Sequence, residues 1–158
     1  MIELEVTRTV GAPVEQVFAR LADIEGHNAW MPRKGSILGR TEQTSAGEPG
    51  LGTTYLDHTS MGATPGEVVL FEPPYALGYH WWNRSRGGRL HVEGWPTYDL
   101  EVAGDGATVV RHIATMRTYG IYRCANPVLR RIAVRERTAT MNALKASFES
   151  TVAENPGE

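Results

Sequence analysis

The sequence of 158 residues contains a single cysteine, Cys124. One cysteine excludes a disulfide framework within the chain and is typical of a protein from a reducing cytoplasm. The sequence also lacks a run of about 18 apolar residues, the length that a membrane-spanning helix needs. Its first residues show neither the basic segment nor the apolar run of a signal peptide. We therefore expect a cytoplasmic protein without stable membrane insertion.

Motifs for metals and nucleotide cofactors are missing as well. The five histidines are scattered, with no His-x-x-x-His or Cys-x-x-Cys spacing that would bring ligands together. The sequence has no Gly-x-Gly-x-x-Gly turn, no phosphate-binding loop and no Gly-x-Ser-x-Gly nucleophile turn. We therefore expect no metal and no cofactor.

A large excess of one charge is absent too, because the formal net charge is only −2. No field of one sign therefore attracts nucleic acid, and we expect no nucleic-acid partner. The local exception runs from Arg111 to Arg137, where seven arginines accompany one acid, Glu136. Two interpretations stay open for this stretch: the solvated outer face of a helix and its neighbouring strand, or a site for an anionic ligand or surface.

The strongest pattern that is present predicts one long helix over residues 126–150. Pro127 suits a first helical turn, where its missing N–H group costs nothing. Residues recur behind it at steps of three and four, which places them on one helix face: Leu129, Ile132, Ala133, Glu136, Ala139, Thr140, Ala143, Leu144, Ser147 and Phe148. Because alanine and serine are small, this face would leave space beneath it, and the pattern indicates a hollow protein.

The rest of the chain predicts strands and two short helices. Residues 2–10 alternate between apolar and polar, as a half-buried strand does. Two short helices are predicted over residues 13–21 and 23–30. Six further strands follow with short turns between them, which favours an antiparallel meander: residues 37–44, 53–60, 67–71, 77–83, 90–102 and 108–117. We expect a single domain over residues 1–153 and a flexible tail at residues 154–158.

This order of elements resembles the START-like (SRPBCC, Bet v 1-like) helix-grip superfamily, and within it the polyketide cyclase/dehydrase and lipid-transport branch. The resemblance covers nearly the whole chain and depends on five stretches: residues 12–18 (APVEQVF), Trp30 with Pro32, residues 50–53 (GLGT), residues 71–74 (FEPP) and residues 104–108 (GDGAT). It implies an α+β fold in which a curved antiparallel sheet of about seven strands surrounds the long C-terminal helix. Activity does not follow, because the fold hosts binders, cyclases, hydrolases and chaperone cofactors.

A hollow interior would form a ligand cavity, and strand parity and helix phase predict which residues line it. We expect the long helix, alternate residues of the last four strands and the loop around Gly50 to line it. The candidate ligand-binding residues are Tyr79, Trp81, Tyr98, Leu100, Val110, Leu129, Ile132, Thr140 and Ala143.

Two titratable residues share these inward positions and are candidate catalytic residues. His112 has the parity of Val110, and Glu136 lies on the apolar helix face. Together they would assist proton transfer in the cavity. The alternatives are a histidine satisfied by a strand neighbour, and a glutamate paired at the surface with Arg130, Arg131 or Arg135. Either Asp57 or His58 also points inward, because the two residues alternate on one strand.

We therefore predict binding of a small hydrophobic ligand, a lipid or an aromatic polyketide-like molecule. In an enzymatic version, the cavity folds the substrate for a cyclisation or dehydration. The alternative is a non-enzymatic interaction protein, chaperone-cofactor-like or toxin-like, that acts through its basic outer surface. A cavity of a few hundred Å³ favours the first function, whereas a filled interior favours the second. The protein is expected to be a monomer or a homodimer.

Overall fold

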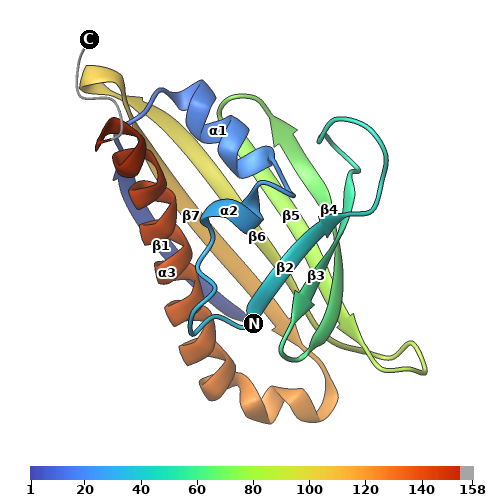
Figure 1. Ribbon diagram of the computed structural model, residues 1–158. Helices are drawn as coiled ribbons and strands as arrows, with labels where there is room; N and C mark the ends of the chain where they lie inside the picture. Colours follow the sequence, from blue (N-terminus) through green and yellow to red (C-terminus); the bar gives the residue numbers. More distant parts are fainter. Residues whose placement is uncertain (154–158) are drawn as a thin grey trace.

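The computed structural model describes residues 1–153, which form one antiparallel sheet and three α-helices (Figure 1). The seven strands are ordered β1-β7-β6-β5-β4-β3-β2 across the sheet. Their bounds are β1 Ile2–Val10, β2 Leu38–Gln43, β3 Thr54–Thr59, β4 Gly62–Glu72, β5 Ala76–Arg84, β6 Leu90–Ala103 and β7 Ala107–Thr118. The predicted tail at residues 154–158 lies outside the described residues.

All three helices lie on the same face of the sheet (Figure 1). They are α1 Val14–Ala22, α2 His27–Trp30 and α3 Asn126–Ala153, with short 3-10 turns at Gly104–Gly106 and Gly120–Ala125. The long helix α3 runs along β1, while α1 covers β5, β6 and β7 near one end of the strands. The predicted α+β helix-grip fold, with two short helices after the first strand and one long C-terminal helix, is therefore confirmed.

One strand begins well before its predicted start, whereas the bounds of the others differ by about one residue. The sequence places the beginning of this strand at Glu67, but β4 begins at Gly62. Residues 62–66 contain two glycines and Pro65, which is a composition typical of a turn. Pairing with β3 overrides that local preference, since Pro65 lies opposite Leu56 within the ladder.

The end of the sheet beneath α1 is tightly packed. Val17, Phe18 and Leu21 of α1 are buried there, and the Phe18 ring meets Phe71 edge-on with centroids 5.3 Å apart. The same cluster includes Leu77, Leu100 and Val110 from the strands and Met141, Leu144 and Phe148 from α3. This end is the hydrophobic core of the protein.

No helix among the described residues is long and apolar enough to span a membrane.

Candidate ligand cavity

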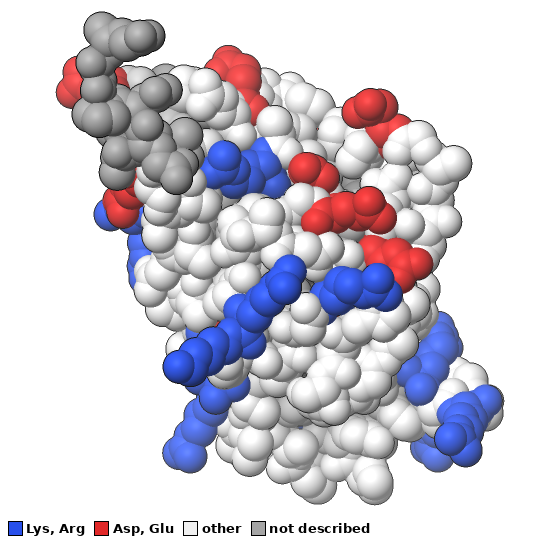
Figure 2. Space-filling model, viewed as in Figure 1, with Lys and Arg blue, Asp and Glu red and all other residues white. Residues whose placement is uncertain are grey.

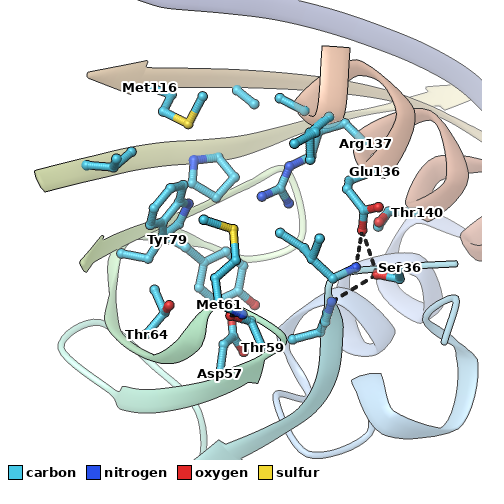
Figure 3. Close-up of a pocket in the computed structure, with 18 of the residues that line it drawn as sticks. Ser36, Asp57, Thr59, Met61, Thr64, Tyr79, Met116, Glu136, Arg137 and Thr140 are labelled. Carbon is cyan, nitrogen blue, oxygen red and sulfur yellow. Dashed lines mark hydrogen bonds between the residues drawn. The ribbon is translucent and has the colours of Figure 1, made fainter. Parts of the chain in front are cut away.

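A cavity of about 410 Å³ lies toward the other end of the sheet, beneath the N-terminal half of α3. Its wall is mostly apolar and comes from the sheet, from α3 and from the segment at residues 31–38 that connects α2 to β2. Figure 3 shows side chains from these elements converging on the space. A volume of this size falls within the range of roughly 300–1,000 Å³ that small-molecule sites occupy.

A row of alternating large side chains and glycines crosses the floor of the cavity. Tyr55, Gly66, Trp81, Gly94 and Met116 are successive cross-strand neighbours on five strands. A Cβ atom at Gly94 would lie 2.6 Å from the Trp81 ring, and one at Gly66 would lie 2.3 Å from the Tyr55 ring. The Trp81 and Tyr55 rings therefore lie over glycines. Because no side chain lies beneath the rings, they stay close to the sheet and leave the space above them open.

Two charged side chains enter the cavity from opposite walls, Arg137 from α3 and Asp57 from β3 (Figure 3). The Oδ1 atom of Asp57 accepts a hydrogen bond of 2.7 Å from the Thr41 hydroxyl. Burial raises the pKa of Asp57, although the Thr41 hydrogen bond and the positive charge of Arg137 oppose this rise. The structure thus resolves the open choice on this strand, because His58 points away and contacts Glu42 at 3.2 Å.

The guanidinium of Arg137 affects several buried groups. Its positive charge and its contact with the Tyr98 side chain oppose the burial that raises the Tyr98 pKa. It likewise opposes the rise in the Tyr55 pKa that burial causes. Among the side chains that the structure describes, no carboxylate forms an ion pair with Arg137 within 4.0 Å.

Glu136 joins the cavity wall to the connecting segment. Its Oε2 atom accepts hydrogen bonds from the Ser36 hydroxyl at 2.5 Å and from the backbone N–H of Ile37 at 3.2 Å. Its Oε1 atom pairs with Arg135 at 3.0 Å, and the side chain is 14% exposed. Glu136 therefore combines the two predicted possibilities, since it lines the cavity and pairs with a surface arginine. Its oxygens bind these partners, so its first role is structural.

His112 is fully buried and lies behind Tyr98, with the two rings stacked at 4.3 Å. Its Nδ1 atom donates to the Thr97 carbonyl at 2.9 Å, so the neutral ring leaves Nε2 as an acceptor. No partner for Nε2 lies within the part of the chain that the structure describes. Burial and then the nearby Arg137 charge lower the His112 pKa to about 3. The lowered pKa favours the neutral form of His112 near pH 7, and its catalytic role stays a prediction.

The predicted wall residues divide into two groups. The first group lines the cavity: Tyr79, Trp81, Tyr98, Leu129, Ile132 and Thr140, together with Glu136. Leu100 and Val110 face the same side of the sheet but lie in the core beneath α1 and do not line the cavity. Ala143 lies on an outer groove beside Trp30 and Arg20, because α3 has turned that position away from the sheet. The role of the lining residues in ligand binding stays a prediction.

Sequence reasoning also misplaced part of the wall. The loop around Gly50 does not reach the cavity, and residues 31–38 take its place. Arg137 was not among the candidates, although it lies four residues after Ala133 and three before Thr140 on the helix. That spacing places Arg137 on the same helix face as these two residues. The sequence therefore contained the signal for an inward position, and Arg137 was passed over because it is charged.

Among the described residues, no three His, Cys, Asp or Glu side chains lie close enough together to hold a metal ion. The cavity contains polar groups that can hold and orient an organic molecule: one guanidinium, one carboxyl with a raised pKa, and tyrosine hydroxyls. Such a set suits recognition of oxygen atoms on an otherwise apolar ligand.

A curved sheet closed by one long helix around a cavity defines a START-like helix-grip protein. The family model described as "Polyketide cyclase / dehydrase and lipid transport" matches residues 1–149, and the chain belongs to this family. The resemblance that the sequence motifs indicated is therefore confirmed. A comparison with curated proteins gives no significant match.

Solved structures with the same fold share little sequence with this chain. A conserved protein from Geobacillus kaustophilus has a TM-score of 0.73 at 14% identity, covering 95% of this chain and 97% of its own. A START superfamily protein from Mycobacterium smegmatis has a TM-score of 0.68 at 11% identity, with 94% and 98% covered. The di-domain ARO/CYC protein BexL of the BE-7585A biosynthetic pathway has a TM-score of 0.72 at 17% identity. The match covers 94% of this chain but only 47% of BexL, so this chain spans about half of that protein.

Proposed function

We propose that this protein binds a small, largely apolar molecule in the cavity beneath α3. The observation that carries the proposal is the cavity itself, about 410 Å³ in volume, with a mostly apolar wall and a few convergent polar groups. The family description, which includes lipid transport, and the fold shared with ARO/CYC proteins support a ligand of this kind.

The alternative, an interaction protein that uses a basic outer surface, has less support. Its main argument was the arginine-rich stretch, but Arg137 points into the cavity and Arg111 forms a bidentate pair with Glu5 at 2.8 and 2.9 Å. On the face shown in Figure 2, basic and acidic side chains lie in adjacent groups instead of forming one continuous basic surface.

Thermal unfolding in the presence of fatty acids, flavonoids and flat aromatic polyketides tests the proposal. A ligand that binds only the folded state at a hundredfold excess over Kd stabilises it by about 2.7 kcal/mol. For a chain of this length that corresponds to a rise in Tm of roughly 5–11 °C. If no compound in the panel raises the Tm or quenches tryptophan emission, the proposal is wrong.

A matched pair of variants locates the site. Ala133 lines the cavity, whereas Ala146 lies on the outer groove of the same helix. The Ala133→Trp substitution should fill the cavity and abolish the ligand-induced shift, while Ala146→Trp should leave it unchanged. Equal loss of binding in both variants would place the ligand elsewhere.

A cyclisation or dehydration reaction is the second candidate, and Asp57 is the observation that favours it. A carboxyl group whose pKa is raised by burial can give a proton to a departing hydroxyl group or take one from a carbon beside a carbonyl. Asp57→Asn keeps the size of the side chain but cannot transfer this proton. We expect the variant to bind polyketide analogues like the unaltered protein, and mass spectrometry should show that it forms no cyclised or dehydrated product.

A further inference from the structure

The charged groups on the cavity wall do not balance. Glu136 is neutralised by Arg135 and by two hydrogen-bond donors. His27 is fully within the protein, where burial lowers its pKa, and its Nε2 atom contacts the Leu21 carbonyl at 2.6 Å. Burial raises the pKa of Asp57, which weakens it as a partner for a cation. Arg137 is therefore a permanent positive charge on the cavity wall. Among the described side chains, no carboxylate lies within ion-pair distance of it.

A guanidinium in such a place is costly unless something pairs with it. Buried or partly buried charges in proteins are normally paired, because an apolar environment does not replace the water that the charge has lost. Arg137 carries five N–H donors in one plane, and among the described residues it acts on the nearby Tyr98 side chain. Its remaining donors point into the space between the walls (Figure 3). The planar arrangement of these donors fits the two oxygens of a carboxylate.

We propose that the ligand is an apolar molecule that carries one carboxylate, which Arg137 binds inside the cavity. This inference rests on the function proposed above and adds the chemical class of the ligand. The carboxylate lies against the guanidinium and the Tyr98 hydroxyl, and the apolar body lies over the floor that Trp81 and Tyr55 form. A free acyl chain and a flat aromatic acid share this chemistry, and the test distinguishes them.

Two sets of three probes, each differing only in the head group, test the proposal by calorimetry. One set is dodecanoate, dodecanamide and dodecylamine; the other is 2-naphthoate, 2-naphthamide and 2-naphthylmethylamine. In at least one set, the carboxylate should bind at least tenfold more tightly than the neutral amide, and the amine should bind more weakly than the amide. The set with the tighter carboxylate identifies the shape of the natural ligand.

Substitution of the arginine supplies the second measurement. In Arg137→Met the affinity for the carboxylate should fall at least tenfold, while the affinity for the amide changes less than twofold. Arg131→Met is the matched control, because Arg131 is exposed on the same helix and does not line the cavity. This control should bind all six probes as the unaltered protein does.

The possible outcomes distinguish a failure of the carboxylate proposal from a failure of the ligand-binding function proposed above. Equal affinities for carboxylate and amide in the unaltered protein overturn the carboxylate proposal and leave a cavity that binds neutral molecules. Unchanged discrimination in a folded Arg137→Met protein overturns it as well. If none of the six probes binds, the proposed function fails together with the carboxylate proposal. Should Arg137→Met fail to fold, the comparison of head groups in the unaltered protein still decides.

Discussion

The two halves of α3 lie over the same sheet, yet one half covers a solid core and the other covers a cavity. Met141, Leu144 and Phe148 of the C-terminal half are buried against the strands and α1. Leu129 and Ile132 of the N-terminal half are only half-buried and border the open space. The strands beneath both halves keep the same alternation of inward and outward residues.

The two ends differ in whether further structure lies between the sheet and α3. At the solid end, α1 inserts Val17, Phe18 and Leu21 between the sheet and α3. At the hollow end α1 does not extend over the space; among the described residues, His27 of α2 and residues 31–38 border its side without filling it. Inward-facing residues therefore become core or cavity wall according to what lies opposite them, and the strand pattern alone does not decide between the two.

The largest effect that we expect concerns the pH dependence of stability and His112, which lies behind the cavity residue Tyr98. His112 is favoured in its neutral form, with a folded pKa of about 3 against an ordinary value of 6.5. Its contribution to stability is complete above pH 6.5 and falls as the pH drops toward 3, by about 1.4 kcal/mol per pH unit and about 5 kcal/mol in all. In His112→Phe this part of the pH dependence should be missing. Urea unfolding of both proteins between pH 7 and 4 measures it, and parallel curves would contradict the assignment.

Removal of side-chain volume should have different costs at the two ends. Leu144→Ala at the solid end should lower the free energy of unfolding by about 2–5 kcal/mol, because it opens a void in a packed core. Leu129→Ala at the hollow end should cost about 1 kcal/mol or less, because the side chain is half-buried and already borders space. Chemical denaturation gives both values. Equal costs would mean that the N-terminal half of α3 is packed as tightly as the C-terminal half.

The wall of the hollow end depends on one carboxylate. Glu136→Gln removes the ion pair with Arg135 and weakens the hydrogen bonds from Ser36 and Ile37. We expect a loss of about 1–2 kcal/mol at pH 7, in the range of hydrogen bonds to charged groups. Glu149→Gln on the exposed side of α3 should change stability by less than about 0.5 kcal/mol. A more stable Gln variant would show that the carboxylate is poorly compensated.

The smallest effect on stability should come from added volume on the cavity floor. In Gly94→Ala the new methyl group meets the Trp81 ring at 2.6 Å, so the ring must move. Overpacking normally costs about 1–3 kcal/mol, but here the ring can move into the cavity, and we expect less than about 1 kcal/mol. Ligand affinity should fall instead, because the displaced ring occupies ligand space. Unchanged affinity together with a large loss of stability would show that the space above Trp81 is filled.

The sequence predicted much of this fold and part of the site. Period-two alternation placed Tyr79, Trp81 and Tyr98 on the inward face, and helix spacing gave the span of α3. It did not separate Trp81, which borders the cavity, from Leu100, which lies in the core, because that difference depends on where α1 lies in three dimensions.

The polar residues of the site were harder to predict for the same reason. A charged residue on an apolar helix face has two physical solutions, a partner at the surface or a place inside a cavity. Glu136 adopts both and Arg137 adopts the second. The choice between them depends on residues about a hundred positions away in the sequence, such as Ser36.

For a ligand bound as proposed above, the contacts of Glu136 with residues 31–38 would also affect how long it stays inside. This segment forms one wall, so a molecule that leaves past it must wait for the bonds to Ser36 and Ile37 to break. These bonds join two parts of the protein and involve no ligand atom, so binding of the proposed ligand need not change them. Weakening them lowers the barrier to entry and to exit equally, so both rates rise while Kd stays constant. For the ligand proposed above, residence time would therefore be controlled separately from affinity, by a carboxylate on the wall that is already bound to the protein.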